Sequence, residues 1–112
     1  MLEINTEVER GILFIRLNGI LNQNNFKAFG LKINSLLYKY GFQYFVFDFT
    51  NIVSLDENIF LRIQNKLIEI FLNCGKVVIS GMSELSKEKI GFTKDRLFYV
   101  DSNIDAFKYF CL

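Results

Sequence analysis

The chain of 112 residues contains no histidine, no proline and no tryptophan, and it has two cysteines. Cys74 and Cys111 stand far apart, without the CxxC spacing of a metal-binding or redox pair. A zinc site and a Cys–His nucleophile both need several residues of these types. The sequence therefore excludes both kinds of site, and we interpret the two cysteines as small core residues.

Long apolar runs and an excess of one charge are also missing. The 13 basic and 12 acidic residues are spread along the chain without a block of either sign, so we expect no nucleic-acid partner. Apolar runs such as Tyr44 to Phe47 are too short to cross a bilayer, and the acidic N-terminus does not resemble a signal peptide. No glycine-rich phosphate loop is present, so no cofactor is expected. These features predict a cytoplasmic protein that does not insert directly into membranes.

What the chain does contain is enough apolar sequence, 51% hydrophobic residues, for one domain over residues 1–112. Apolar and polar residues alternate from Leu2 to Val8, which predicts a strand with one wet face. A hairpin turn at Arg10-Gly11 leads to a more buried strand over Ile12–Leu17, which Asn18-Gly19 closes.

The rest of the chain alternates helical and extended patterns. Apolar residues recur at steps of three and four in the predicted helices, and Gly41 is placed to end the first of them. Short apolar runs predict the strands. A capping pattern at Ser102 introduces the last helix, with Ile104, Phe107 and Cys111 predicted to face inward. The predicted elements are helices over 25–40, 56–74, 83–90 and from 102 onward, and strands over 44–49, 76–80 and 97–100.

The order β-β-α-β-α-β-α-β-α predicts an α/β fold. We expect a mixed β-sheet with an N-terminal β-hairpin and about four helices packed mainly on one side. No repeat, linker or low-complexity segment interrupts this order.

The most informative stretch runs from Phe45 to Phe71, where a buried strand ends at an acidic turn and an amphipathic helix begins. Asp56, Glu57 and Asn58 lie at the N-terminus of that helix, where acidic side chains are stabilising. Ser54 and Glu57 fit the S-x-x-E capping box, or Asp56 is itself the cap. These residues either cap the helix or contact a partner.

Other candidates have simpler interpretations. Asp48 at a strand end is read as a turn or cap residue, because the sequence places no second titratable group beside it. Ser80 to Ser83 either lines a small site or forms a strand-to-helix turn. Phe60 and Leu61 lie beside the main apolar stripe, so one of them could form the apolar part of a docking surface.

Several local patterns resemble the STAS family, the small domains typified by bacterial anti-sigma factor antagonists, over essentially the whole chain. In that family the second strand ends in a Leu-x-Gly-x-Leu/Asp pattern, which Leu17–Leu21 matches, and the third ends in an Asp-Leu-Ser/Thr-like turn, which Asp48–Asn51 matches. The family motif hydrophobic-Asp-Ser-Ser-Gly-Leu at the start of the second helix aligns with Leu55–Phe60. There only the Asp and the flanking apolar residues are kept.

In family members that act as sigma-factor switches, a partner kinase phosphorylates the first serine of that motif. The equivalent position here is Glu57, which has no hydroxyl to accept phosphate. Glutamate carries one negative charge, whereas phosphoserine carries about −1.5 to −2, so Glu57 either mimics the phosphorylated state poorly or is neutral in effect. Ile59 replaces the motif glycine and adds bulk where a partner would approach. Thr50 and Ser54 remain as alternative hydroxyls.

The resemblance implies a non-enzymatic, protein-binding regulator of transcription in sporulation or stress response. Its partner would be an anti-sigma factor/serine kinase of ATPase fold, engaged through Asp56, Glu57 and Asn58 with apolar contact from Phe60 or Leu61. The alternative is a structural or transporter-associated STAS module, which forms homo-oligomers or STAS-domain assemblies or binds an ABC-type lipid transporter. An enzyme ranks last, because no nucleophile, metal cluster or base accompanies the carboxylates.

Overall fold

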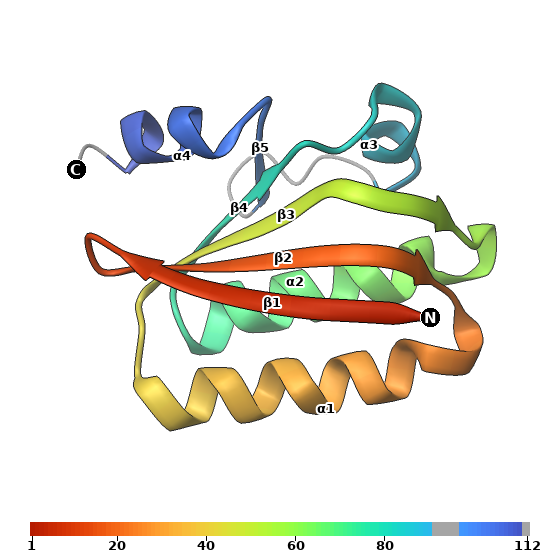
Figure 1. Cartoon of the computed structure of the whole chain (residues 1–112), viewed down its shortest axis with the longest axis horizontal. Helices are drawn as coiled ribbons and strands as arrows, with labels where there is room; N and C mark the ends of the chain where they lie inside the picture. Colours follow the sequence, from red (N-terminus) through yellow and green to blue (C-terminus); the bar gives the residue numbers. More distant parts are fainter. Residues whose placement is uncertain (91–96, 111–112) are drawn as a thin grey trace.

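A computed structural model, which describes residues 1–90 and 97–110, forms a five-stranded sheet with helices on both faces (Figure 1). The strands lie in the order β1-β2-β3-β4-β5, with β1 antiparallel to β2 and the other neighbours parallel. The elements are β1 (Leu2–Glu9), β2 (Ile12–Leu21), α1 (Gln23–Tyr40), β3 (Tyr44–Leu55), η1 (Glu57–Ile59), α2 (Phe60–Asn73), β4 (Lys76–Ser80), α3 (Glu84–Ile90), β5 (Leu97–Val100) and α4 (Asn103–Tyr109).

The N-terminal hairpin forms at the predicted turn. Arg10 and Gly11 both have positive φ, 53° and 80°. A two-residue turn of this handedness matches the right-handed twist of the strands that it joins. The prediction of a hairpin, and of its turn residues, is confirmed.

Two apolar layers hold the helices against the sheet. The larger layer packs α1, α2 and α3 on one face, and its fully buried side chains include Ile33, Phe47 and Ile63. The smaller layer packs α4 on the other face through Ala106 and Phe110. Figure 1 shows α1 and α4 on opposite sides of the sheet. The predicted mixed sheet with helices mainly on one side is confirmed.

Two strands are longer than predicted. β2 does not close at Asn18-Gly19 but continues to Leu21, pairing with a β3 that itself continues to Leu55. Register shifts fall between Arg16 and Asn18 and again after Gly19, so the glycine belongs to an irregular strand. Gly19 has φ 114°, and a Cβ there would lie 2.2 Å from the Met1 carbonyl oxygen. The glycine therefore permits a close backbone approach inside the sheet.

The helix ends mostly follow the sequence signals, with small differences. Asn22 caps α1, which begins two residues earlier than predicted, and Gly41 ends it in the left-handed conformation, as expected. α3 begins at Glu84. Its predicted stop at Gly91 lies outside the described residues.

The last helix is capped by Ser102, as predicted, but one of its inward residues is wrong. Ile104 is 69% exposed, because α4 meets the sheet through Ala106, Phe107 and Phe110. Cys111 lies outside the described residues. Cys74 is half-buried at the edge of the larger layer rather than within it. Among the described helices, none is long and apolar enough to cross a membrane.

Candidate functional site

The start of α2 is reached through a short 3-10 turn, η1, and its cap is Asp56. The Asp56 Oδ1 atom accepts a hydrogen bond from the Asn58 N–H at 3.2 Å. Ser54 still belongs to β3, so the alternative S-x-x-E capping box is wrong. A carboxylate that satisfies a free N–H of a helical turn is the usual form of an N-cap.

Glu57 forms an ion pair across to α3 instead of capping the helix. Its Oε1 lies 2.6 Å from Nζ of Lys89, and the same ammonium group lies 5.3 Å from the centre of the Phe60 ring. The hydrogen bond and the charge of Lys89 hold the pKa of the Glu57 carboxyl below its ordinary value. The charge of Glu57 is therefore matched by a cation of the chain itself.

Phe60 and Leu61, the two apolar candidates, have opposite environments. Phe60 is 7% exposed and belongs to the larger apolar layer, whereas Leu61 is 65% exposed. A hollow of about 370 Å³ lies between them and the ion pair of Glu57 and Lys89. Asn58 is exposed beside it. The start of α2 thus presents one projecting apolar side chain, one shallow hollow and a neutralised carboxylate.

A second hollow, of about 290 Å³, lies between the end of β3 and the turn from β4 to α3. Thr50 and Ser54 line one side, and Gly81 and Ser83 line the other. The stretch from Ser80 to Ser83 therefore joins β4 to α3 and also lines this hollow. The hydroxyls of Thr50 and Ser54 belong to exposed residues. Among the described residues, no group of three His, Cys, Asp or Glu side chains could hold a metal ion.

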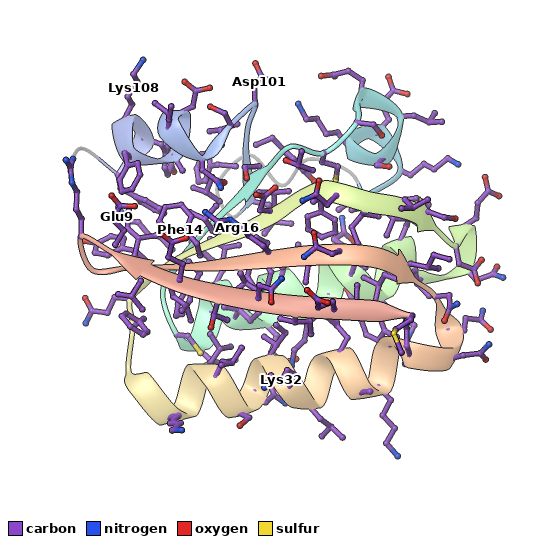
Figure 2. All side chains as sticks on the ribbon, in the orientation of Figure 1. Glu9, Phe14, Arg16, Lys32, Asp101 and Lys108 are labelled. Atoms are coloured by element: carbon purple, nitrogen blue, oxygen red, sulfur yellow. The ribbon has the colours of Figure 1, made fainter. Side chains whose placement is uncertain are left out.

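Asp48 joins a polar cluster on the opposite face, at the N-terminus of α4. Its Oδ1 accepts from the Thr50 N–H at 2.9 Å, and its Oδ2 accepts from Nδ2 of Asn103 at 3.1 Å. Asn103 Oδ1 in turn accepts from the Ser80 hydroxyl at 2.6 Å. The Arg16 Nε atom lies 3.9 Å from Asp48, and Figure 2 shows Arg16 on β2. Asp48 lies within β3, which continues to Leu55, and the prediction that it is a strand-end turn or cap residue is wrong. Its carboxylate instead joins the cluster that fastens α4 to the sheet.

Sequence reasoning missed Lys89 and Asn103. Both act on predicted residues, Glu57 and Asp48, from positions 32 and 55 residues away along the chain. Local patterns describe neighbours within a turn or two, so neither pairing leaves a signal near the residue that it serves. The folded sheet and its helices bring each pair together.

Comparison with known proteins gives structural matches. No protein-family model matches the chain, and no curated protein matches its sequence. An anti-sigma factor antagonist from Mycobacterium paratuberculosis superimposes with TM-score 0.75 and 15% identity, covering 97% of this chain and 93% of that one. The antagonist SpoIIAA in its unphosphorylated form gives TM-score 0.70 and 14% identity, covering 99% and 97%. A variant of RsbS from Moorella thermoacetica gives 0.68 and 14%, covering 96% and 97%.

This chain has the fold of the anti-sigma factor antagonists. The match extends over nearly the full length of each of these structures. The resemblance read from the sequence is thereby supported at the level of the fold.

Proposed function

We propose that the protein is a regulatory module that binds a partner protein through the start of α2 and that it is not switched by phosphorylation at position 57. The observation that carries the proposal is the pairing of Glu57 with Lys89 at 2.6 Å. If position 57 corresponds to the serine of the family motif, as the resemblance implies, a carboxylate paired with a lysine of the same chain stands in its place. This arrangement suits a surface with one constant state.

The partner that we propose is an anti-sigma factor/serine kinase of ATPase fold. Leu61 would supply the apolar contact, since it is 65% exposed next to the hollow. Asp56 and Asn58 would set the polarity of the surrounding rim. Buried interface centres are usually apolar with a polar rim, and the start of α2 has that composition. The protein acts in this proposal by occupying the kinase, without chemistry of its own.

The test is affinity capture from native lysate with four baits: the wild-type chain, Glu57→Ser, Leu61→Asp and the matched control Leu72→Asp. Leu72 is also an exposed leucine of α2, with 61% of its surface accessible, and lies outside the proposed surface. We expect the wild type and the Leu72 variant to retain a kinase of ATPase fold and the Leu61 variant to lose it. Incubation with ATP should phosphorylate the Glu57→Ser bait alone.

Two outcomes would overturn the proposal. Undiminished capture by a bait carrying Asp56→Arg with Glu57→Arg would show that the partner binds elsewhere. Capture of transporter subunits, or of the protein itself, with no kinase in any sample would favour the structural or transporter-associated module instead. That alternative draws its support from the absence of a hydroxyl at position 57.

A further inference from the structure

β1 is an edge strand with a complete row of free backbone groups. Among the described strands it pairs with β2 alone, without a register shift along its eight residues. The Ile20 N–H donates to the Met1 carbonyl, so the odd-numbered residues of β1 make the hydrogen bonds to β2. The N–H and C=O groups of the even-numbered residues therefore point away from the sheet. β1 has no proline, bulge or lysine to block this edge, and its only charged residues are Glu3, Glu7 and Glu9.

The same even-numbered residues face α1 and line two hollows along the edge. A hollow of about 350 Å³ lies at Leu2 and Ile4, with Ala28 and Phe29 of α1 as its floor. A second, of about 250 Å³, lies further along β1 and is lined by Thr6, Glu7, Val8, Leu13, Leu36 and Phe42. The two hollows lie roughly four strand residues apart, or about 14 Å. An added strand would place side chains two and four residues apart over this groove.

The opposite face of β1 is acidic. Glu3, Glu7 and Glu9 alternate along it, and all three are exposed. The Arg16 guanidinium pairs with Glu7 at 2.6 Å. Within the described part of the chain, no ion pair includes Glu3 or Glu9. Figure 2 shows Glu9 at the hairpin end of the strand. A strand added here would meet apolar hollows on one side and negative charge on the other.

We propose that the edge of β1 binds an extended segment of a partner protein, which adds to the sheet beside β1. In the bound segment, every second residue would be apolar and face α1, and the residues between them would be basic and face the glutamates of β1. Main-chain hydrogen bonds to Leu2, Ile4, Thr6 and Val8 would supply affinity, and the hollows and charges would supply specificity. A second copy of this chain is a poor occupant, because pairing two β1 edges brings the glutamates of both copies together. The site lies apart from the start of α2 and does not depend on the function proposed for it.

The probe is an eight-residue peptide with blocked ends that alternates valine and lysine. Titration into the ¹⁵N-labelled full chain should shift the amide signals of residues 2–8 and of the α1 residues that line the groove. The matched control peptide has the same composition with the valines grouped before the lysines. It carries the same charge but cannot present the two faces, so we expect at least tenfold weaker binding.

Two variants of the protein test the geometry. Thr6→Pro removes an N–H that points away from β2, so the ladder between β1 and β2 is kept while one bond to the peptide is lost. We expect at least tenfold weaker peptide binding, and Thr6→Val should bind within twofold of the wild type. Ala28→Gln fills the larger hollow from an exposed helix position and should weaken binding about fivefold. Lys27→Gln, in the same helix, lines neither hollow and serves as its control.

Three results would overturn the proposal. Equal affinity for the alternating and grouped peptides would indicate unspecific attraction between charges. Shifts confined to residues outside β1 and α1 would place the site elsewhere. Self-association of the free chain, abolished by Thr6→Pro, would make a second copy the occupant. Ala28→Gln keeps the test decisive if Thr6→Pro does not fold, since that alanine is on the helix surface.

Discussion

Phe60 and Leu61 are adjacent in sequence, and their burial predicts opposite consequences of truncation. Phe60 is 7% exposed within the larger apolar layer, and Phe→Ala in a packed core costs about 3–5 kcal/mol. The hollow beside the ring gives the site some room to relax, so we expect about 3 kcal/mol for Phe60→Ala. Leu61 has about a third of its surface buried, and Leu61→Ala should cost roughly 0.5–1 kcal/mol.

Urea denaturation followed by far-ultraviolet circular dichroism measures both values. With a denaturant slope of about 1.5 kcal/mol per M, Phe60→Ala should lower the midpoint by about 2 M, whereas Leu61→Ala should lower it by less than about 0.7 M. Leu72→Ala, at another exposed leucine of α2, is the matched control and should behave like Leu61→Ala. The proposed partner assay should separate the two exposed leucines, which stability does not. Leu61→Ala should lose capture of the partner, whereas Leu72→Ala should keep it.

The reasoning fails if Leu61→Ala destabilises the chain as much as Phe60→Ala does. It also fails if Phe60→Ala costs less than about 1 kcal/mol, because a buried phenylalanine cannot be removed from a close-packed layer so cheaply. Either result would mean that the first turn of α2 is not packed as described, and the assignment of Leu61 as the exposed contact would fall with it.

Further predictions concern a turn, an ion pair and a bridge. Gly81→Ala places a Cβ 2.0 Å from a threonine hydroxyl and should cost more in urea denaturation than Gly11→Ala, which meets nothing within 4 Å and costs about 1–2 kcal/mol for its backbone conformation. Because the pKa of Glu57 is lowered in the folded chain, its pairing with Lys89 should stabilise the fold above about pH 4.5, and this stabilisation should be lost as the pH falls through the folded pKa. Lys89→Gln should remove this contribution to the pH dependence of the urea midpoint. In the same variant, the pKa of the Glu57 carboxyl measured by NMR titration should return to its ordinary value. Asn103→Ala should cost about 1–3 kcal/mol and speed amide exchange in α4, while unchanged exchange there would contradict the bridging role.

The order of elements could be read from the sequence because each depends on local signals. Gly41 takes the left-handed cap conformation, Arg10-Gly11 the primed turn and Ser102 the N-cap, and all of them stand where the pattern put them. A helix needs 3.6-residue periodicity and a capping residue, both of which are visible in a single segment. These elements therefore carried enough information to predict the mixed sheet.

The strand ends and the site contacts depend on other parts of the chain. Gly19 looks like a turn residue in isolation, and its place in β2 follows from the close approach of Met1. The sequence pattern predicts Ile104 as a core residue, but α4 packs on the sheet through Ala106 and Phe110, and Ile104 is left exposed. Likewise, no pattern near Glu57 could reveal a lysine on another helix. Tertiary contacts decide these features, and periodicity alone does not contain them.

The ion pair with Lys89 supports one of the two readings of Glu57, and we propose that Glu57 is neutral in effect rather than a poor mimic of phosphoserine. One lysine matches the single charge of a glutamate, whereas it would leave part of a phosphoserine's charge of about −1.5 to −2 uncompensated. In this proposal the surface around Glu57 is nearer in charge to an unphosphorylated state than to a phosphorylated one. We therefore expect Glu57 to contribute little to the ionic-strength dependence of capture, because its charge is paired with Lys89. Lys89→Gln would expose the carboxylate and should weaken capture, most clearly at low salt. Equal capture by Lys89→Gln and wild type at low salt would show that the charge at position 57 does not govern binding.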